Sequence, residues 1–273
     1  MRVIIDGRPV DPHHATISVF DWGLLRGDGI FEAIRSYRGR LFRLDAHLAR
    51  LQRSAALMQL ELPDLSEIAR WASAVAEDGG DCSVRILVTR GGSDPDVDCP
   101  ARVVVLWEPV PDLPVSVSVR PTPAPWQSGG VPWELMGAKT LSYAPNMSAW
   151  RTARAEGFTD ALLISGNGFV LEGPTFSIGW VVDGVIETPS LDLGILASIT
   201  RMVTLEEAAN LGLIVDEGRF PLDRVLKADE VFALSTLKEV TPVDRVGTTR
   251  FATGPVTEKL MAAYLSRVEA ETS

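Results

Sequence analysis

Lys139 is the residue of this chain best placed for covalent chemistry. The chain has four lysines against 22 arginines, and an arginine keeps its proton at working pH, so it cannot form an imine. Lys227 and Lys259 lie in polar stretches with helical character and Lys238 in a loop-like one, whereas Lys139 follows the largely apolar segment 133–138. Desolvation there would lower the pKa of the amine and free it to react with an aldehyde. On position alone, a surface lysine that buries only its aliphatic stem remains the alternative.

The composition indicates a soluble globular protein. With 273 residues and 46% hydrophobic residues, the chain can bury the core of one large domain or of two modest ones. Its formal net charge of -10 and the lack of a basic run disfavour nucleic acid and anionic membrane surfaces as partners. No apolar stretch reaches the roughly 18 residues of a membrane span, and the N-terminus lacks the apolar core of a signal peptide. We therefore expect a cytoplasmic protein.

Cysteine and histidine are too scarce to suggest a metal site or a disulfide framework. The only cysteines are Cys82 and Cys99, and the only histidines are His13, His14 and His47. Two cysteines cannot build a disulfide scaffold or a cysteine metal site, and one further histidine is too little to complete a site around the adjacent pair. No bound metal is expected.

Strands and helices are mixed along the chain without a regular βαβ alternation. The periodicity predicts helices at 44–58, 65–76, 143–155, 199–211 and 255–268. It predicts strands at 30–37, 41–42, 84–88, 103–107, 115–119, 161–164 and 169–171, a hairpin around 183–184, and a strand pair near Val231 and Val240. This order favours an α+β fold.

One segment is a candidate linker between two domains. Residues 121–130 combine three prolines with two glycines and contain no strong helix or strand pattern, which is typical of a connection. The predicted organisation is therefore a small N-terminal α/β domain over residues 1–120, the linker, and a larger C-terminal domain over residues 131–273 that carries Lys139.

Six separate segments of the chain occur in a characteristic order. They are Arg26–Arg35, His47–Leu51, Lys139–Tyr143, Leu171–Thr175, Ile199–Arg201, and Ser235–Thr236 with Glu239–Val243. In this order they resemble the fold-type IV family of pyridoxal-phosphate enzymes, which contains the branched-chain aminotransferases, the D-amino-acid aminotransferases and the aminodeoxychorismate lyases. The resemblance extends over nearly the whole chain, from Asp21 to Val243. The fold it implies is the two-domain α+β fold of the D-amino-acid aminotransferases.

The resemblance implies a role for each member of a set of residues toward pyridoxal 5'-phosphate. Lys139 would carry the cofactor as an aldimine and move a proton between the substrate Cα and the cofactor C4′. Glu172 would hold the pyridine nitrogen protonated, and Arg50 would bind the phosphate. The other cofactor contacts would be Tyr143 at the phenolic oxygen and, around the phosphate, Ser198, Ile199, Thr200, Ser235 and Thr236.

Several of these residues also have a purely structural interpretation. If the resemblance is set aside, the sequence predicts a solvated glutamate at a strand end for Glu172. Arg50 reads as an exposed helix arginine, like its neighbour Arg53. Tyr143 could serve only for packing, and Thr200 could cap the helix that begins there.

The substrate contacts are expected on one strand face. Alternate residues of a strand share a face, so Phe31, Ala33 and Arg35 would point together, with aliphatic room beside one positive charge. This strand most resembles that of the branched-chain aminotransferases, which usually have glycine at the position of Ala33. Arg85 also has a counterpart in that group, where the position of Ser83 is a tyrosine. A plain strand face packed on the core is the alternative for Phe31 and Ala33.

The substrate region departs from each known subgroup. Segment 93–97 is acidic, so the basic carboxylate trap of the D-amino-acid enzymes is absent, as is the glycine-arginine-glycine-tyrosine run of many lyases. Ser177 and Gly179 replace the usual asparagine and phenylalanine.

The expected reaction is transamination between a hydrophobic, branched-chain-like amino acid and 2-oxoglutarate in a homodimer. A 4-amino-4-deoxychorismate lyase that releases 4-aminobenzoate and pyruvate, and a non-enzymatic descendant of the family, are the alternatives.

Overall fold

The computed structural model describes residues 2–94, 96–112 and 114–273. The chain divides into two compact units, each of which is described by itself. The first unit comprises Met1–Pro111, Ala138–Tyr143 and Glu271–Ser273, and the second comprises Asp112–Gly137 and Ala144–Ala270.

The first unit is a six-stranded sheet covered by helices on one face. Its strands occur in the order β2-β1-β6-β5-β3-β4, and neighbouring strands pair antiparallel. The strands are β1 (Val3–Ile5), β2 (Arg8–Val10), β3 (Gly29–Tyr37), β4 (Arg40–Leu41), β5 (Cys82–Thr89) and β6 (Arg102–Pro109). The helices are the 3-10 helix η1 (Pro12–His14), α1 (Trp22–Arg26), α2 (Leu44–Met58) and α3 (Leu65–Gly79).

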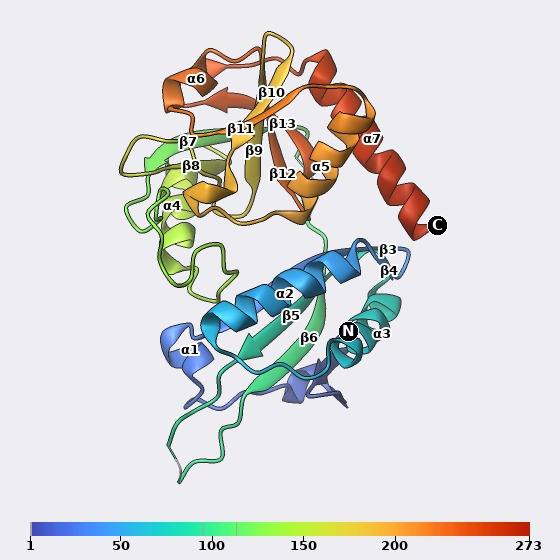
Figure 1. The fold of residues 1–273 in the computed structure, drawn as a ribbon. Coiled ribbons are helices and arrows are strands. Elements are labelled where there is room, and N and C mark those ends of the chain that lie inside the picture. The colour runs from blue at the N-terminus through green and yellow to red at the C-terminus, as the bar shows by residue number, and fades with distance from the viewer. Residues whose placement is uncertain (1, 95, 113) are drawn as a thin grey trace. The chain divides into compact units, whose positions relative to one another are not determined.

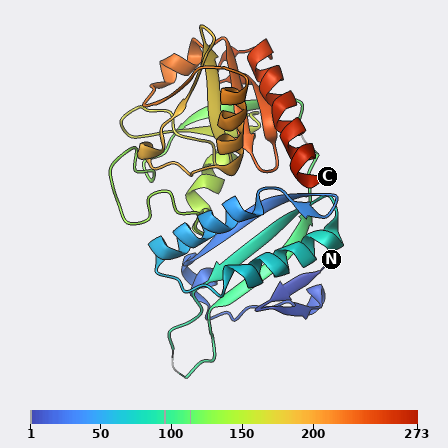
Figure 2. The ribbon, with the colours of Figure 1, turned by 45° about the vertical axis from the view of Figure 1, so that its right-hand side comes forward.

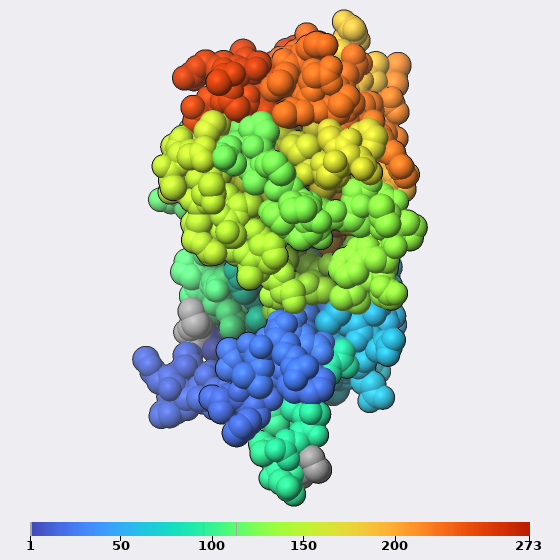
Figure 3. Space-filling model, turned by 90° about the vertical axis from the view of Figure 1, so that its left-hand side faces the viewer, coloured from blue at the N-terminus to red at the C-terminus, as the bar shows by residue number. Residues whose placement is uncertain are grey.

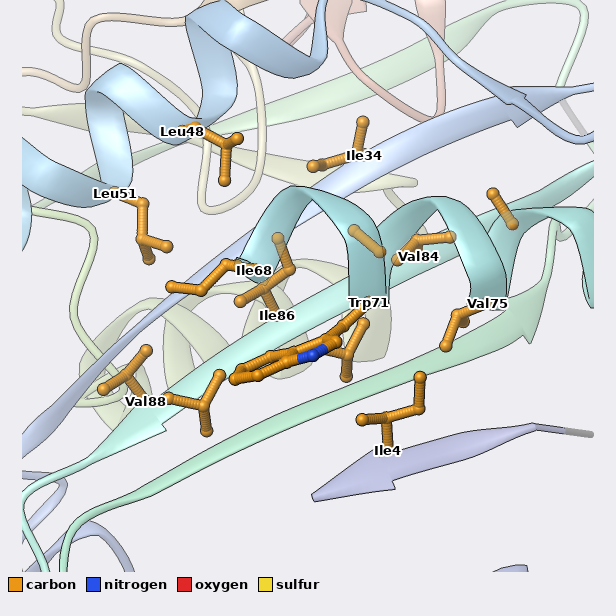
Figure 4. Close-up of a cluster of buried hydrophobic side chains, with 14 of the residues drawn as sticks. Ile4, Ile34, Leu48, Leu51, Ile68, Trp71, Val75, Val84, Ile86 and Val88 are labelled. Atoms are coloured by element: carbon orange, nitrogen blue, oxygen red, sulfur yellow. The ribbon is translucent and has the colours of Figure 1, made fainter. Parts of the chain in front are cut away.

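Helices α2 and α3 lie side by side over the same face of this sheet (Figures 1 and 2). Burial along β3 alternates residue by residue, as expected for a strand with one face on a core. Figure 4 shows the core between helices and sheet, built from Ile4, Ile34, Leu48, Leu51, Ile68, Trp71, Val75, Val84, Ile86 and Val88. This packing fixes β3 and α2, the two elements that carry several of the predicted site residues.

The second unit is built on an eight-stranded mixed sheet. The order is β11-β10-β9-β12-β13-β7-β8, with β14 paired to β13, and the pairs β10–β11, β13–β7 and β7–β8 are parallel. The strands are β7 (Val117–Pro123), β8 (Asp160–Ile164), β9 (Ser177–Val182), β10 (Val185–Pro189), β11 (Val215–Gly218), β12 (Glu230–Ser235), β13 (Glu239–Val246) and β14 (Thr249–Arg250).

The described residues of the second unit form five helical segments, and α5 packs against β12 and β13. Trp180 and Phe232 are among the largest side chains that are fully buried. Within the described part of the chain, no helix has the length and apolar character needed to cross a membrane. The helical segments are α4 (Ala144–Ala155), η2 (Leu191–Leu193), α5 (Ile199–Asn210), α6 (Leu222–Leu226) and α7 (Pro255–Thr272).

The α+β fold is confirmed, and the predicted helices form within a few residues of their expected bounds. The segment predicted as a linker is different, because its beginning belongs to β7. Pairing of β7 with β13 ends at Val119, whereas pairing with β8 continues to Pro123. The N–H of Ala124 donates to the carbonyl of Ile164 in β8. Because the backbone N–H groups of a strand alternate between its two sides, the nitrogens of Pro121 and Pro123 face the side of β13, where pairing has already ended. A proline is tolerated at such an edge position.

Lys139 is also placed differently from the expectation. The prediction assigned it to the C-terminal domain, whereas its segment, Ala138–Tyr143, groups with the first unit. The physical reason is a short antiparallel bridge between Thr140 and Ile30 at the start of β3. This bridge joins segments more than 100 positions apart, which no local pattern can reveal.

Candidate active site

The backbone on both sides of Lys139 is fixed by the first unit. The N–H of Phe31 donates to the Lys139 carbonyl at 3.0 Å. The N–H of Lys139 donates to Oγ of Ser54, on α2, also at 3.0 Å. With the bridge at Thr140, these bonds hold the segment along the first residues of β3. The lysine therefore extends from a defined backbone position.

The amine of Lys139 lies beside a pair of aromatic rings. Nζ is 4.3 Å from the ring centroid of Phe31 and 5.6 Å from that of Tyr143. It also lies 3.5 Å from the Tyr143 hydroxyl. The rings themselves meet edge to face, with centroids 5.2 Å apart and an interplanar angle of 77°, a favourable arrangement for an aromatic pair. An amine beside a phenol and two hydrocarbon faces is suited to proton transfer.

Arg50 is buried in an ion pair that sequence reasoning missed. Its Nε and Nη2 donate to the two oxygens of Glu32 at 2.8 and 2.6 Å. Nδ1 of His47 lies 2.8 Å from the same carboxylate. Arg50 is 4% exposed and Glu32 is fully buried. The interpretation of Arg50 as an exposed helix arginine is therefore wrong, and the two parallel bonds fix the plane of its guanidinium.

The protonation states of this trio follow from its burial and charges. Burial opposes ionisation of Glu32, but the charge and hydrogen bonds of Arg50, together with His47, outweigh it and lower the pKa of the carboxyl to about 2. Burial also lowers the pKa of His47, against the opposing effect of Glu32. Glu32 is thus an anion and Arg50 its cation at neutral pH, while the positive form of His47 is disfavoured.

Helix spacing provides the signal that could have revealed this arrangement. His47, Arg50 and Ser54 recur at intervals of three and four residues, so they share one side of α2. Glu32 is a carboxylate in the buried register of β3, between the apolar residues Ile30 and Ile34. A charge at such a position is almost never fully buried without a partner.

Glu172 lies in the second unit, beside the loop that leads into α5. Its backbone carbonyl accepts from the N–H of Leu163, which extends the edge of β8. Its Oε2 accepts from the N–H of Leu196 at 3.3 Å, two residues before Ser198. The structure thus brings together Glu172 and the helix start that was predicted to bind phosphate. Glu172 is half-buried, not a freely solvated glutamate.

Helix α5 begins with a capped and partly buried turn. Oγ of Ser198 accepts from the N–H of Arg201 at 3.2 Å, so Ser198, and not Thr200, is the N-cap. Ile199 and Thr200 are the first helical residues, and both are buried. The N–H groups of a first turn have no acceptor within their helix and attract an anion. The backbone N–H groups of this first turn can therefore bind a phosphate, whereas the Ser198 hydroxyl caps the helix.

Ser235 and Thr236 lie at the turn from β12 to β13. Oγ of Ser235 accepts from the N–H of Lys238 at 3.0 Å, so this hydroxyl also stabilises its own turn. Nζ of Lys238 pairs with buried Asp160 at 2.9 Å. Lys238 therefore acts as a structural lysine, and the half-buried Thr236 keeps the position from which it could donate to an anion.

The predicted substrate strip occupies one face of β3. Phe31, Ala33 and Arg35 are half-buried, whereas the residues between them are fully buried beneath the helices. Arg85, on β5, lies directly opposite Ala33. Its Nε donates to Oε2 of Glu108 at 2.5 Å. Phe31, Ala33 and Arg35 share one face of β3, as the alternation predicted. Arg85, on the neighbouring strand, is engaged by a carboxylate that the sequence did not indicate.

The structure thus places the predicted site residues in two groups, one in each unit. The first unit contains Phe31, Ala33, Arg35, Arg50, Arg85, Lys139 and Tyr143. The second unit contains Glu172, Ser198, Ile199, Thr200, Ser235 and Thr236.

Comparison with known proteins identifies the family. The sequence model of the family "Amino-transferase class IV" matches residues 29–246. A putative branched-chain-amino-acid aminotransferase of Methanocaldococcus jannaschii is 34% identical over 89% of this chain and 87% of its own length. A D-alanine aminotransferase of Listeria innocua is 31% identical over 98% of this chain and 96% of its own.

A solved structure agrees with the sequence match. The 4-amino-4-deoxychorismate lyase of Pseudomonas aeruginosa superposes with a TM-score of 0.82 at 26% identity, covering 98% of this chain and 99% of the other. The names of the three relatives give three different activities, so likeness alone does not select a substrate. The match over most of the chain does decide the family: this protein belongs to the class IV aminotransferases, the fold-type IV enzymes that depend on pyridoxal phosphate.

Proposed function

We propose that the protein is a transaminase that exchanges an amino group between a hydrophobic, branched-chain-like amino acid and 2-oxoglutarate. The observation that carries the proposal is the position of Lys139, whose amine lies 4.3 Å from the ring of Phe31. Phe31 is also the first residue of the β3 strip that continues with Ala33 and Arg35. The face of β3 thus offers an apolar surface and a positive charge, with the amine of Lys139 beside its first residue.

The residue types in each unit suit pyridoxal 5'-phosphate. In the first unit, Lys139 would supply the amine for its aldehyde, Tyr143 a phenol for its ring oxygen, and Arg50 a charge for its phosphate. In the second unit, the first turn of α5 and the turn at Ser235–Thr236 would supply further donors for an anion. When bound, the cofactor supplies an electron-poor ring that stabilises negative charge at the substrate Cα.

Lys139 is the proton carrier in this proposal. An amine that alternates between its neutral and protonated forms can remove a proton at the substrate Cα and return it at a neighbouring atom. The hydroxyl of Tyr143, 3.5 Å from Nζ, orients that amine, and the ring of Phe31 limits access of water to it. Buried Ser54 fixes the backbone from which the side chain swings.

Glu172 is proposed to hold a proton on the pyridine nitrogen. Glu172→Gln keeps the shape of the side chain but removes its charge, so kcat should fall roughly 30- to 150-fold, as for the loss of a hydrogen bond of ~2–3 kcal/mol to a charged group. Cofactor binding should change little. Glu258→Gln, at an exposed position of α7, is the control. Full activity of Glu172→Gln in a steady-state assay would make Glu172 a structural residue.

The class of reaction can be tested by a spectral half-reaction. Without an acceptor, a transaminase converts its yellow cofactor to the pyridoxamine form when an amino acid alone is added. We expect L-leucine or a similar aliphatic L-amino acid to bring about this change, and D-alanine to fail, because segment 93–97 lacks basic residues.

The lyase is the second candidate, and the likeness to the Pseudomonas aeruginosa lyase supports it. If no amino acid changes the spectrum, and 4-amino-4-deoxychorismate yields 4-aminobenzoate and pyruvate, the lyase replaces the transaminase. The presence of Lys139, Glu172 and Arg50 together disfavours a non-enzymatic descendant, because each is a group that cofactor chemistry requires.

A cytoplasmic homodimer is the proposed form of the protein. The N-terminal segment, blue on the face shown in Figure 3, carries apolar side chains at the surface, among them Val19 (66% exposed), Leu24 (58%) and Leu25 (60%). A cluster of this kind is typical of an interface, and a second copy of the chain is the proposed partner. Sedimentation should give a dimer at micromolar concentration, and a monomer alone would contradict this.

A further inference from the structure

The backbone of Lys238 closes the turn between β12 and β13, which consists of Thr236–Lys238. Its N–H donates to Oγ of Ser235 at 3.0 Å, and its carbonyl accepts from the hydroxyl of Thr241. Within the part of the chain that the structure describes, none of the bonds that fix this turn uses the N–H or the hydroxyl of Thr236. Both groups therefore stay available as donors to an anion.

The side chain of Lys238 is anchored on two other segments of the second unit. Its Nζ donates to Oδ2 of Asp160 at 2.9 Å and to Oγ1 of Thr175 at 3.4 Å. It also lies 4.7 Å from the ring centroid of Phe176. Asp160 is the first residue of β8, and its side chain is 3% exposed. A carboxylate at this depth requires a cation, so the ammonium is fixed where it lies.

The second anchor belongs to the short turn that follows Glu172. The N–H of Gly173 donates to the carbonyl of Phe176 at 2.7 Å. A Cβ at Gly173 would lie 1.9 Å from the ring of Phe176, so the close packing of this turn requires glycine. Phe176 itself is 4% exposed. The ammonium of Lys238 thus connects the turn that contains Thr236 to a closely packed part of the unit.

We propose that Lys238 is a positioning residue for the phosphate of the cofactor. Its anchored ammonium holds the turn so that the two donors of Thr236 are in place before the ligand arrives. Donors ordered in advance bind more tightly, because binding does not have to order the loop. The inference rests on the proposed role of this turn toward pyridoxal 5'-phosphate. It does not depend on the choice between transaminase and lyase, since both use the cofactor.

Binding of pyridoxal 5'-phosphate and of pyridoxal to the apoenzyme tests this role. The two ligands differ only in the phosphate, so a change in one Kd without the other isolates that group. The double variant Asp160→Asn/Lys238→Met removes both charges of the anchor, and asparagine keeps an acceptor for the N–H of Ala161. The Kd of pyridoxal 5'-phosphate should rise roughly tenfold or more, as for a lost hydrogen bond to a charged group. That of pyridoxal should stay within about twofold.

Single variants and a control separate positioning from folding. Lys238→Met alone leaves Asp160 buried without its cation, so it should unfold at a lower temperature than the double variant. Lys238→Arg keeps the cation and should bind pyridoxal 5'-phosphate more tightly than the double variant. Lys227→Met, in a pair with Asp223 whose side chains are 74% and 65% exposed, should leave both Kd values unchanged.

Three results would overturn the positioning role. The first is a folded double variant with the wild-type Kd for pyridoxal 5'-phosphate. The second is an equal weakening of both ligands, which would indicate a general effect on the fold. The third is a Lys238→Arg variant that binds no better than the double variant.

Thr236→Val distinguishes failure of this role from failure of the proposed site, because it removes the hydroxyl and keeps the shape of the side chain. If it weakens pyridoxal 5'-phosphate alone and the double variant does not, the turn binds the phosphate and Lys238 does not position it. If neither variant changes this Kd, the turn has no part in phosphate binding and both ideas fail. If the double variant behaves as expected but no amino acid converts the cofactor, transamination fails and the role of Lys238 stands.

Discussion

Lys139→Ala is expected to lower kcat by roughly 1,000-fold or more, because the variant loses both the amine that carries the cofactor and the proton carrier of the reaction. The fold should persist, since the bonds that fix position 139 come from its backbone. The measurement is steady-state turnover with saturating cofactor, together with the absorbance of the purified protein.

Two further variants sharpen this prediction. Lys139→Arg keeps the positive charge but cannot release its proton, so it should be as inactive as alanine. Lys227→Ala, at a lysine with 74% of its side chain exposed, should retain wild-type turnover. If Lys139→Arg kept more than about a tenth of the activity, Lys139 would act only as a charge, contrary to its role in general acid–base catalysis.

Glu32→Gln is expected to destabilise the first unit by about 3–5 kcal/mol, the usual effect of removing one partner of a buried ion pair. The guanidinium of Arg50 would then be buried without its anion, at 4% exposure. The variant should also bind the cofactor more weakly, because the fixed plane of Arg50 is lost. Urea denaturation at pH 7 and a cofactor titration measure these two effects.

The pH dependence gives this prediction a second readout. The pKa of Glu32 is about 2 in the folded protein, against an ordinary value of 4.5. A carboxyl with a lowered folded pKa contributes stability above its unfolded pKa, and this is lost as pH falls toward the folded value. The wild type should thus lose stability from about pH 4.5 down to about pH 2, and Glu32→Gln should lack this part of the loss. Glu67→Gln, in an exposed pair with Arg70, is the control, and a Glu32→Gln profile parallel to that of the wild type would contradict the ion pair.

The sequence was most informative where one local pattern decides the structure. Apolar spacing predicted α2, and alternation predicted β3 with Phe31, Ala33 and Arg35 on one face. The linker prediction for segment 121–130 was wrong at its start, where the prolines belong to β7. Prolines are tolerated there because the neighbouring strand β13 has already stopped pairing with β7. That information lies more than 100 residues further along the chain.

The site shows the same division between local and long-range information. The family resemblance indicated Lys139 and Arg50, but not that Arg50 is held by Glu32 or that Arg85 is held by Glu108. Each of these ion pairs joins residues on different elements, and many other pairings of 26 basic and 36 acidic residues were equally compatible with the sequence. Only the register of the strands and the packing of α2 select among them.

The most direct test of this account is the identity of the lysine that carries the cofactor. Borohydride reduction of the holoenzyme fixes a pyridoxyl group on that amine, and proteolysis with mass spectrometry then locates it. We expect the label on the peptide that contains Lys139, in amounts close to the bound cofactor. A label on Lys227, Lys238 or Lys259, with Lys139 unmodified, would contradict the account.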